Sequence, residues 1–543
     1  MRRFLLDLLA LTLILIAPFA VLLSFNGYSY TAPEVLLIAG LVLATAAVVA
    51  ALLGFAHELI RAVVFAALIA LFIEMHFELP AWPSLGIAAV FLAAVAALAG
   101  ILWLLRLHAT KILAVIFVTL IGLTLVRSDS TSHQIVREEA PVAKGSDTGP
   151  PLLIHLLLDE HIGVAGLPSE IPGAQELRPE LIDFYTSRGF RLFGRAYSQY
   201  ANTYNSIANL LNFASHGESH PYLLHGADET AWGLKQSAYF QMLQQRGYRL
   251  HVYQSTYLDL CHVENVQLQG CTTYPVSSLG MLQDLQLPAV EKARAIGNAI
   301  VTQSKVMHVL NKVYERGIRG ALQRVGLDAP EWRWQPPSFG PLRVPTVFDR
   351  LSEDILEHPR GHAFFAHLIM PHYPYVWDRN CALRERTSEW LTNHISSPDA
   401  LVYNTPDSRA RKYERYFEQV RCVFTMVDEL LMALDSRGLL ADATIIVNGD
   451  HGSRIPKHFP SGATLASGVL SEKDYSDTFS TLYAVKAPDV SPGYDDAPRS
   501  VVELLDHDLA GEPLRAPSSC RVFLLEENGD GTLTAVEPKF CAP

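Results

Sequence analysis

The chain has 543 residues, of which 50% are hydrophobic and 18% are charged, and its formal net charge is -12. This apolar content excludes a disordered chain, and the 34 glycines, 32 prolines and 6 cysteines are too few for a collagen or a small disulfide scaffold. The first 130 residues hold equal numbers of acids and bases, so the negative charge lies on residues 131–543. Nucleic-acid binding needs a basic surface, and this acidic region therefore excludes nucleic acid as a partner.

Apolar stretches that are long enough to cross a bilayer as helices fill the first 126 residues. The five candidates are Phe4–Ser24, Val35–Phe55, His57–Phe77, Leu85–Leu105 and Lys111–Val126. The third and fifth candidates are the weaker ones. Arg61 and Glu74 shorten the apolar centre of the third, and the fifth is short unless the side chain of Lys111 extends to the membrane interface. We predict a transmembrane domain of about five helices over residues 1–127, with four helices as the alternative.

Basic residues in the short loops predict the orientation of these spans. The loops 26–34 and 74–84 contain no Lys or Arg, whereas the basic residues on the side of the N-terminus are Arg2, Arg3, Arg61, Arg106 and Lys111. We therefore expect a multi-pass protein of the inner (cytoplasmic) membrane with a cytoplasmic N-terminus. An odd number of spans places everything after Arg127 in the periplasm or another extracytoplasmic space.

All six cysteines follow the spans, which suits an oxidising compartment. Their order along the chain favours the pairs Cys261 with Cys271, Cys381 with Cys422, and Cys520 with Cys541. Buried free thiols or a metal cluster are the alternative, although no C-x-x-C spacing is present.

The region after the spans alternates between strand and helix patterns. Residues 128–150 are polar and predict a linker. Apolar runs of strand length follow at 152–158, 248–253, 363–369, 444–447 and 479–485. Helical patterns at 180–187, 238–245 and 410–434 end at or near Gly189, Gly247 and Gly438. This alternation predicts an α/β fold with a mostly parallel central sheet over residues 151–515.

Two segments stand apart from this alternation. Residues 288–325 carry seven basic and two acidic residues with apolar residues at helical spacing, which predicts either a helix on anionic lipid headgroups or an ordinary helix that covers the sheet. Residues 516–543 predict a C-terminal hairpin around Asn528–Gly531 that a disulfide closes.

Three of the apolar runs end in carboxylates and imidazoles. Residues 152–158 are followed by Asp159 and Glu160, and residues 444–447 lead to Asp450 and His451. The run 363–369 contains His367 and is followed by His372. Because ligand sites of open α/β sheets gather at the carboxyl ends of strands, these side chains are expected at one edge, where they suit a divalent cation.

A candidate nucleophile lies ahead of an apolar helical pattern. Thr203 stands in the segment Tyr200–Leu211, where a hydroxyl would face the positive end of a helix dipole and free backbone N–H groups. The alternative is that Thr203 only caps the helix.

These motifs, in this order, resemble the alkaline phosphatase superfamily in its sulfatase-like branch. The order is an acidic strand end, T-x-x-S before a helix, H-x-x-x-x-H with a neighbouring Pro, and D-H-G. Five spans before such a domain resemble the lipid A phosphoethanolamine transferases and the lipoteichoic acid synthases. Formylglycine sulfatases need C/S-x-P/A-x-R, and the segment from Thr203 to Ile207 has neither the modifiable residue nor the Arg.

The resemblance implies a role for each candidate residue. Asp159, Asp450 and His451 would bind a divalent metal, Zn or Mn, and Glu160 would share or take the role of the first acid. Thr203 would be the nucleophile and would also touch the metal. The remaining candidates for binding substrate phosphate, a second metal or a leaving-group proton are His367, His372 and His458.

We therefore expect a metal-dependent transferase of phosphoethanolamine or phosphoglycerol. It would take a phospholipid headgroup as donor and an envelope glycan or lipid as acceptor, and the bilayer would hold the donor. Two alternatives remain open: a phosphodiesterase or phosphatase with the same fold, and a catalytically silent envelope regulator.

Overall fold

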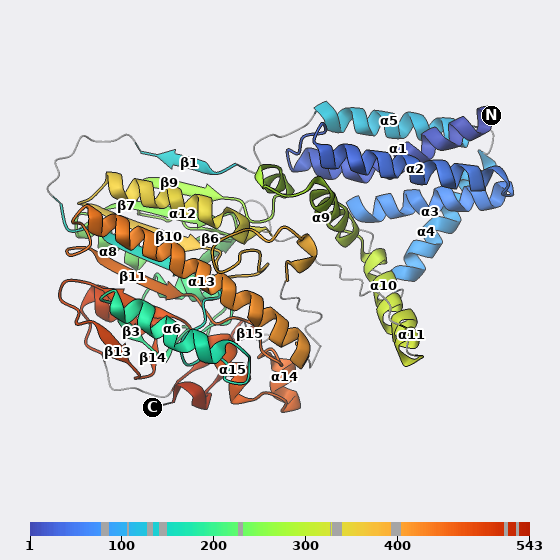
Figure 1. The fold of residues 1–543 in the computed structure, drawn as a ribbon. Helices are drawn as coiled ribbons and strands as arrows, with labels where there is room; N and C mark the ends of the chain where they lie inside the picture. The colour runs from blue at the N-terminus through green and yellow to red at the C-terminus, as the bar shows by residue number, and fades with distance from the viewer. Residues whose placement is uncertain are drawn as a thin grey trace. The chain divides into compact units, whose positions relative to one another are not determined.

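The computed structural model describes residues 1–77, 86–105, 108–126, 134–140, 149–225, 232–325, 327, 339–391, 403–514, 520–527 and 531–542. The chain divides into two units, which Figure 1 shows with their elements labelled. The helical unit consists of Met1–His133, Ser277–Pro337 and Glu385–Thr387. The sheet unit consists of Gln134–Val276, Ser338–Arg384 and Ser388–Pro543.

Within the described residues, five helices of the helical unit are long and apolar enough to cross a membrane, so the five predicted spans are confirmed. They are α1 (Arg2–Phe25), α2 (Pro33–Gly54), α3 (Glu58–His76), α4 (Ile87–Leu104) and α5 (Ala109–Val126). The charge that interrupts the third span is paired, because Arg61 Nη2 donates to both carboxylate oxygens of Asp7 on α1, at 2.5 and 2.7 Å. A buried charge in an apolar helix bundle needs such a partner.

The basic segment 288–325, with the turn of helix before it, belongs to the helical unit. Its elements are η1 (Leu279–Asp284), α9 (Ala289–Thr302), α10 (Lys305–Val313), η2 (Tyr314–Arg319) and α11 (Gly320–Arg324). Glu74 at the end of α3 accepts hydrogen bonds from Ser304 Oγ at 2.5 Å and from the Lys305 backbone N–H at 2.6 Å. Helix α9 contacts α2, and α10 contacts α3 and α4. The alternative of a helix that covers the sheet is therefore wrong, whereas contact with anionic headgroups stays a prediction.

The sheet unit is built on nine strands in the order β1-β9-β7-β10-β2-β11-β12-β3-β13. Neighbours from β9 to β11 run parallel, and β1 and β12 pair antiparallel with β9 and β11. The predicted α/β fold with a mostly parallel sheet is confirmed. In chain order the strands are β1 (Val136–Glu139), β2 (Leu153–Leu158), β3 (Arg191–Phe193), β7 (Arg249–Ser255), β9 (Leu268–Tyr274), β10 (His362–Leu368), β11 (Thr444–Gly449), β12 (Tyr483–Lys486) and β13 (Gly493–Asp495).

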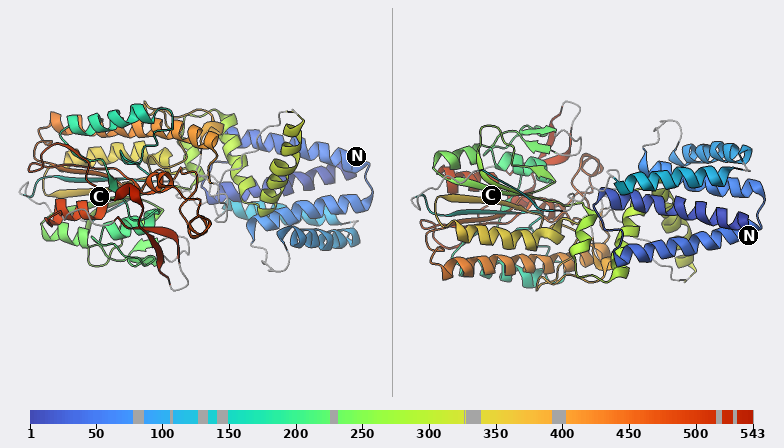
Figure 2. Two further views of the ribbon diagram at one scale, coloured as in Figure 1. Left: turned by 90° about the horizontal axis from the view of Figure 1, so that it is seen from below. Right: turned by 90° about the horizontal axis from the view of Figure 1, so that it is seen from above.

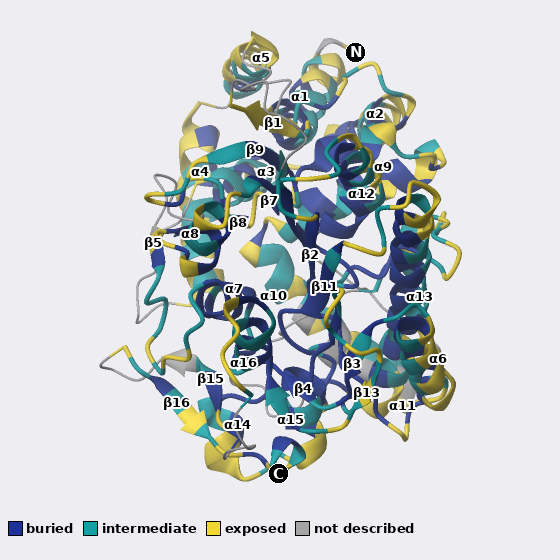
Figure 3. Ribbon diagram, turned by 90° about the vertical axis from the view of Figure 1, so that its left-hand side faces the viewer, coloured by how far each residue is buried: buried dark blue, intermediate teal, exposed yellow. Residues whose placement is uncertain are grey.

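Helices cover both faces of this sheet, as the two views of Figure 2 show. One layer contains α6 (Ala174–Ser187), α12 (Gly340–Glu357) and α13 (Pro406–Ser436); the other contains α7 (Thr203–Leu210), α8 (Ala238–Gln245) and α16 (Val501–Leu505). All six residues of β2 are buried, and Figure 3 shows β2 and β11 as buried strands in the middle of the sheet. Burial on both faces explains why these strands are continuous apolar runs rather than alternating ones.

The remaining elements are short. They are β4 (Ala196–Tyr197), β5 (Leu223–His225), β6 (Trp232–Leu234), β8 (Leu258–Asp259), η3 (Thr387–Glu389), α14 (Gly462–Ser467), α15 (Glu472–Phe479), β14 (Arg499–Ser500), η4 (Asp506–Ala510), β15 (Val522–Glu527), β16 (Leu533–Val536) and η5 (Lys539–Cys541).

Several boundaries differ from the sequence expectation. The run 479–485 is not one strand, because Phe479 ends α15 and the strand begins only at Tyr483. The predicted linker 128–150 contains β1, which pairs with β9; residues 127–133 and 141–148 lie outside the described residues. Helices α6, α8 and α13 do end before Gly189, Gly247 and Gly438, each of which has a positive φ that a helix stop of this kind requires.

The disulfides are those that the order of the cysteines favours: Cys261 with Cys271, Cys381 with Cys422, and Cys520 with Cys541. The alternative of free thiols or a cysteine metal cluster is therefore wrong. The last disulfide lies beside the antiparallel pair β15 and β16, as the predicted hairpin requires. Residues 528–530 of its expected turn lie outside the described residues.

Candidate metal centre and nucleophile

Three adjacent parallel strands carry the candidate residues at their carboxyl ends. Strand β2 lies between β10 and β11, and all three run in the same direction. Asp159 follows β2 directly, Asp450 follows β11 directly, and His367 is the last residue but one of β10. The predicted edge of the sheet therefore exists, and it is the edge at which α/β folds place their ligands.

Asp159, Asp450 and His451 form the centre of this edge. Each offers a ligand atom that lies within 4.8 Å of the other two, and all three side chains are buried. The loops are held together by Asp450 Oδ1, which accepts the backbone N–H of Glu160 at 2.9 Å and that of His451 at 2.8 Å. The second oxygen of Asp450 stays free of hydrogen bonds among the described residues.

Sterics explain why position 452, the last of the D-H-G motif, is a glycine. A Cβ atom on Gly452 would collide with the backbone of Asp477 and Thr478, which approaches the loop closely. The Gly452 N–H donates to the Thr478 carbonyl oxygen at 2.8 Å across this contact. Any larger residue would push the loop, and with it Asp450 and His451, away from the edge of the sheet.

The two histidines of H-x-x-x-x-H contact the two acidic residues after β2. His367 Nε2 lies 3.2 Å from Asp159 Oδ2, and His372 Nε2 lies 3.6 Å from Glu160 Oε1. His367 is buried, whereas the side chain of His372 is 17% exposed and can be reached from solvent. The structure thus brings both imidazoles to the carboxylates, and His372 is the more accessible of the two.

Thr203 is the first residue of α7, and its side chain lies beside the cluster. Thr203 Oγ1 is 3.5 Å from His451 Nε2, and the residue is 4% exposed. The cap of α7 is Asn202, whose side chain accepts the Asn205 N–H at 2.9 Å. The capping alternative for Thr203 is therefore wrong, and its hydroxyl is available for chemistry at the helix N-terminus.

The hydroxyl of Ser206 joins α7 to the loop that carries Asp450 and His451. Ser206 Oγ donates to the Asp450 carbonyl oxygen at 2.5 Å and lies 3.0 Å from Ser198 Oγ. Ser206 is one turn after Thr203, so this bond fixes the distance between the N-terminus of α7 and the end of β11. The hydroxyl three residues after Thr203 thus makes a positioning contact in this chain.

Burial and neighbouring charges shift the pKa values of the three carboxyl groups, those of Asp159, Glu160 and Asp450. Burial and the negative charge of Asp159 raise the pKa of Asp450. Burial raises the pKa of Glu160 as well, with Arg454 opposing it and Asp159 adding to it. Burial alone would also raise the pKa of Asp159, but His372 and His367 outweigh it and lower that pKa. Buried carboxylates this close cannot all ionise without a nearby cation.

Unpaired polar atoms test whether a divalent cation fits here. Among the described residues, hydrogen bonds are missing at five buried oxygen or nitrogen positions of this edge besides Asp450: Asp159 Oδ1, Glu160 Oε1 and Oε2, His161 Nε2 and His367 Nδ1. Buried polar groups normally have partners, so such a concentration needs an explanation. Carboxylate oxygens and an imidazole nitrogen are ligands for Zn or Mn, and the residues present therefore fit the metal.

The tautomer of His451 agrees with this fit. Its Nδ1 lies 3.0 Å from the Gly452 carbonyl oxygen, which can only accept a hydrogen bond. Nδ1 therefore carries the proton, and Nε2 presents a lone pair toward Thr203 and Asp450. Burial and the charge of Arg454 lower the pKa of His451 to about 3, which keeps the imidazole neutral as a metal ligand must be.

Arg454 is a site residue that the sequence reasoning missed. Its guanidinium Nη1 lies 4.0 Å from Glu160 Oε1, and its side chain is 15% exposed. Arg454 lies two residues after Gly452 and has a positive φ of 52°. Hydrophobic periodicity in the sequence does not predict such a loop conformation. The only available signal was a cation shortly after D-H-G in an otherwise acidic domain.

His458 stays a prediction. The structure shows its backbone N–H donating at 2.8 Å to Oδ1 of Asp474, which lies in the first turn of α15. This contact does not join it to the carboxylates.

Comparison with known proteins gives a family and a set of similar folds. The family model described as Sulfatase matches residues 179–471, more than half of the chain. A phosphonate monoester hydrolase of Agrobacterium radiobacter is 13% identical, with 70% of this chain and 82% of that chain covered and a TM-score of 0.39. The C-terminal periplasmic domain of EcEptC from Escherichia coli, in complex with Zn, is 13% identical, with 74% and 95% covered and a TM-score of 0.39. No curated protein matches the chain.

Proposed function

The chain belongs to the sulfatase family, and from that premise we propose that it is a metal-dependent transferase that moves a phosphoethanolamine or phosphoglycerol group through Thr203. The family makes the chain an enzyme of the alkaline phosphatase superfamily. The observation that carries the proposal is the position of Thr203, whose hydroxyl is free of capping and lies 3.5 Å from His451.

Asp159, Asp450 and His451 would hold the divalent metal, with Glu160 as a further acid. When bound, the cation supplies positive charge that favours the deprotonated Thr203 hydroxyl and offsets the charge of the substrate phosphate. The residues of this chain add to that field. The N-terminal end of α7, which begins at Thr203, adds the positive end of a helix dipole, and Arg454 brings a guanidinium to the edge of the cluster.

The transfer proceeds in two displacements at phosphorus. Burial lowers the pKa of His372, and its Nδ1 faces the Tyr373 carbonyl oxygen, so the neutral ring offers a lone pair at Nε2. Thr203 passes its proton through water to this Nε2, its Oγ1 attacks the phosphodiester, and the bond to the lipid alkoxide breaks as the alkoxide takes that proton from His372. A phosphodiester on Thr203 results. An acceptor hydroxyl then gives its proton to His372 and attacks the same phosphorus. The bond between phosphorus and Thr203 Oγ1 breaks, and Thr203 takes that proton back through water. His372 suits this role because it is the exposed imidazole of the pair.

Thr203 also explains why sulfate ester hydrolysis by the formylglycine route is not proposed. A threonine cannot be converted to the formylglycine aldehyde, and no Arg stands in the following four positions. A hydroxyl nucleophile that forms a phosphodiester needs neither.

The membrane spans support a lipid donor. The five helices of the helical unit tether the enzyme to a bilayer, so a donor headgroup is held at the membrane surface rather than captured from solution. We propose that the N-terminus is cytoplasmic and that the sheet unit is periplasmic, which agrees with the basic loops and with three disulfides in the sheet unit.

The test is to trap the phosphodiester on Thr203. The full chain is incubated with vesicles of phosphatidylethanolamine or phosphatidylglycerol, and its peptides are weighed by mass spectrometry. We expect a headgroup adduct on the Thr203 peptide, loss of the adduct and of turnover in Thr203→Ala, and both retained in Thr186→Ala on α6. Full turnover by Thr203→Ala would overturn the proposal. Release of free headgroup phosphate, even with a glycan or lipid acceptor present, would make the enzyme a hydrolase.

A further inference from the structure

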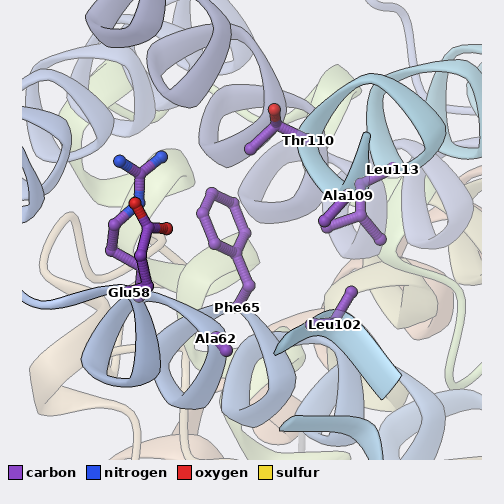
Figure 4. A pocket seen from close by; sticks show the side chains of 8 residues that line it. Glu58, Ala62, Phe65, Leu102, Ala109, Thr110 and Leu113 are labelled. Carbon is purple, nitrogen blue, oxygen red and sulfur yellow. The ribbon is translucent and has the colours of Figure 1, made fainter. Parts of the chain in front are cut away.

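The two ends of α3 differ in how their charges are used. At its beginning, Glu58 is paired with Arg3, and Arg61 is paired with Asp7. Glu58 and Arg61 line a hollow of about 30 Å³, which Figure 4 shows and which has room for about one water molecule. At the end of α3, Glu74 instead accepts hydrogen bonds from the start of α10. The charges at the beginning of α3 thus stay within the bundle, whereas the segment after its end leaves basic and apolar side chains exposed.

Helix α10 begins at the level at which α3 leaves the bilayer. Ser304 caps α10, because its Oγ accepts the Met307 N–H at 3.1 Å, and the same hydroxyl binds Glu74. Glu74 lies in the last turn of α3, one of the five spans, so the cap of α10 lies near the lipid headgroups. Figure 1 shows α10 and α11 running across the direction of α1, α2 and α3. A helix that crosses the direction of the spans lies along the plane of the membrane.

Large apolar side chains stand exposed along one face of this segment. The exposed fractions are 51% for Leu310, 57% for Val313, 54% for Ile318 and 70% for Val325. Leu310 and Val313 are three residues apart on α10, and Ile318 follows Val313 by five residues across the π-helical turn η2. Residues four and five apart share a face in a π-helix, as residues three and four apart do in an α-helix, so η2 keeps Ile318 on the face of Leu310 and Val313. A row of exposed apolar side chains indicates an interaction site.

The same segment is basic. Residues 305–325 hold five Lys or Arg and one Glu, a net charge of +4, whereas the whole chain has a net charge of -12. The side chains of Lys305 and Arg324 are exposed. A basic helix with an apolar face is typical of a segment that lies in the interface of an anionic bilayer, with its apolar side chains about 5–10 Å into the boundary between headgroups and acyl chains. A partner protein would also cover an apolar face, but the positive charge and the position beside the spans favour the bilayer.

We propose that residues 305–325 form an interfacial helix that binds the anionic phospholipids of the leaflet at the end of α3. Leu310, Val313 and Ile318 enter the boundary between headgroups and acyl chains, and the basic side chains lie among the lipid phosphates. The segment leaves the sheet unit after β9 and returns to it before α12, so it gives the sheet unit a second membrane attachment besides the connection from α5. This attachment does not depend on the proposed transfer reaction.

The test measures how deeply single positions lie in the bilayer. Val313→Cys and Ile318→Cys are made in the full chain and labelled with a fluorophore at the new thiol, since the six native cysteines are paired in disulfides. The protein is reconstituted in vesicles of phosphatidylcholine and phosphatidylglycerol. Met432→Cys on α13 is the matched control, because Met432 is 58% exposed and Val313 is 57% exposed. We expect a nitroxide on the acyl chains to quench the labels at 313 and 318 several-fold more than the label at 432, and iodide in the water to do the reverse.

The contribution of charge is tested with Lys305→Gln combined with Arg324→Gln, and with vesicles of phosphatidylcholine alone. Either change should weaken the acyl-chain quenching at 313, and unchanged quenching in both would overturn the preference for anionic lipid. Equal quenching of the labels at 313 and 432 by the acyl-chain nitroxide would overturn the proposal as a whole. Labels at 313 and 318 that neither quencher reaches would also overturn it, because protein, such as a second copy of the chain, would then cover this face.

Discussion

The hydroxyl of Tyr416 holds the loop that carries Asp159 and Glu160, and its removal has a calculable effect. Tyr416 Oη donates to the Glu160 carbonyl oxygen at 2.7 Å and accepts the Ile162 backbone N–H at 2.8 Å. All three residues are buried. Tyr416→Phe keeps the ring and leaves one carbonyl and one N–H buried without a partner.

The cost follows from those two groups. A buried polar group without a partner costs about 1–3 kcal/mol, so the loss of two partners should cost the variant roughly 2–6 kcal/mol of folding free energy. For a large domain, about 1 kcal/mol lowers the Tm by about 2 °C, which gives a fall of roughly 4–12 °C. The loop would also loosen, so the affinity for the divalent metal should fall.

Tyr185→Phe is the matched control. Tyr185 is fully buried on α6, but its hydroxyl has no hydrogen-bond partner among the described residues. Removing that hydroxyl leaves nothing unpaired and relieves a buried polar atom, so the Tm should stay or rise.

The assay is thermal unfolding of the full chain in detergent, followed by tryptophan fluorescence, with metal content measured on the same samples. We expect a clear fall in Tm for Tyr416→Phe and none for Tyr185→Phe. If the two variants had the same Tm, the loop would not be held by the Tyr416 hydrogen bonds.

Two other predictions concern pH and the helix that carries the nucleophile. His155 is fully buried, and burial lowers its pKa to about 4, so its stabilising contribution is complete above about pH 6.5 and is lost as the pH falls to 4. The free energy of folding lost over this pH range is about 3 kcal/mol, since a tenfold change in proton affinity is about 1.4 kcal/mol. His155→Gln should therefore make the Tm fall less steeply as the pH is lowered. If the fall were unchanged, groups other than His155 would cause it. Asn202→Ala should cost about 1 kcal/mol and reduce turnover through Thr203, whereas Thr405→Ala, which removes the cap of α13, should cost as much stability and leave turnover intact. Equal turnover in the two cap variants would show that the start of α7 does not position the nucleophile.

The part of the site that lies at strand ends could be predicted from the sequence. Asp159 and Asp450 each follow an apolar run, and such runs become parallel strands whose carboxyl ends meet at one edge. The local order of residues is enough for this inference. The same holds for the disulfides, because neighbouring cysteines in the chain paired with each other.

Residues in loops with left-handed backbone could not be predicted in this way. Arg454 and Glu160 both have positive φ, and their meeting at 4.0 Å depends on how two loops fold over the sheet. The position of the basic segment around α10 could not be predicted either. It is set by hydrogen bonds from Ser304 and Lys305 to Glu74, which lies 230 and 231 residues earlier in the chain. Periodicity describes one helix and not the partner that it packs on.

The capping question shows the same limit on a smaller scale. From the sequence, Thr203 could cap α7 or serve as nucleophile, since both roles use a hydroxyl at a helix start. The structure separates them through Asn202, which takes the cap one residue earlier. Sequence patterns do not predict a helix boundary to within one residue.

The proposed function requires a divalent cation at Asp159, Asp450 and His451. The decisive measurement is the metal content of the purified full chain, by elemental analysis, for the wild type and for Asp450→Ala combined with His451→Ala. His262→Ala, which removes an imidazole whose side chain is 70% exposed, serves as the control. We predict stoichiometric Zn or Mn in the wild type and the control, and its loss in the double variant. A folded wild type with all three disulfides and no bound metal would contradict the account and favour a catalytically silent envelope protein.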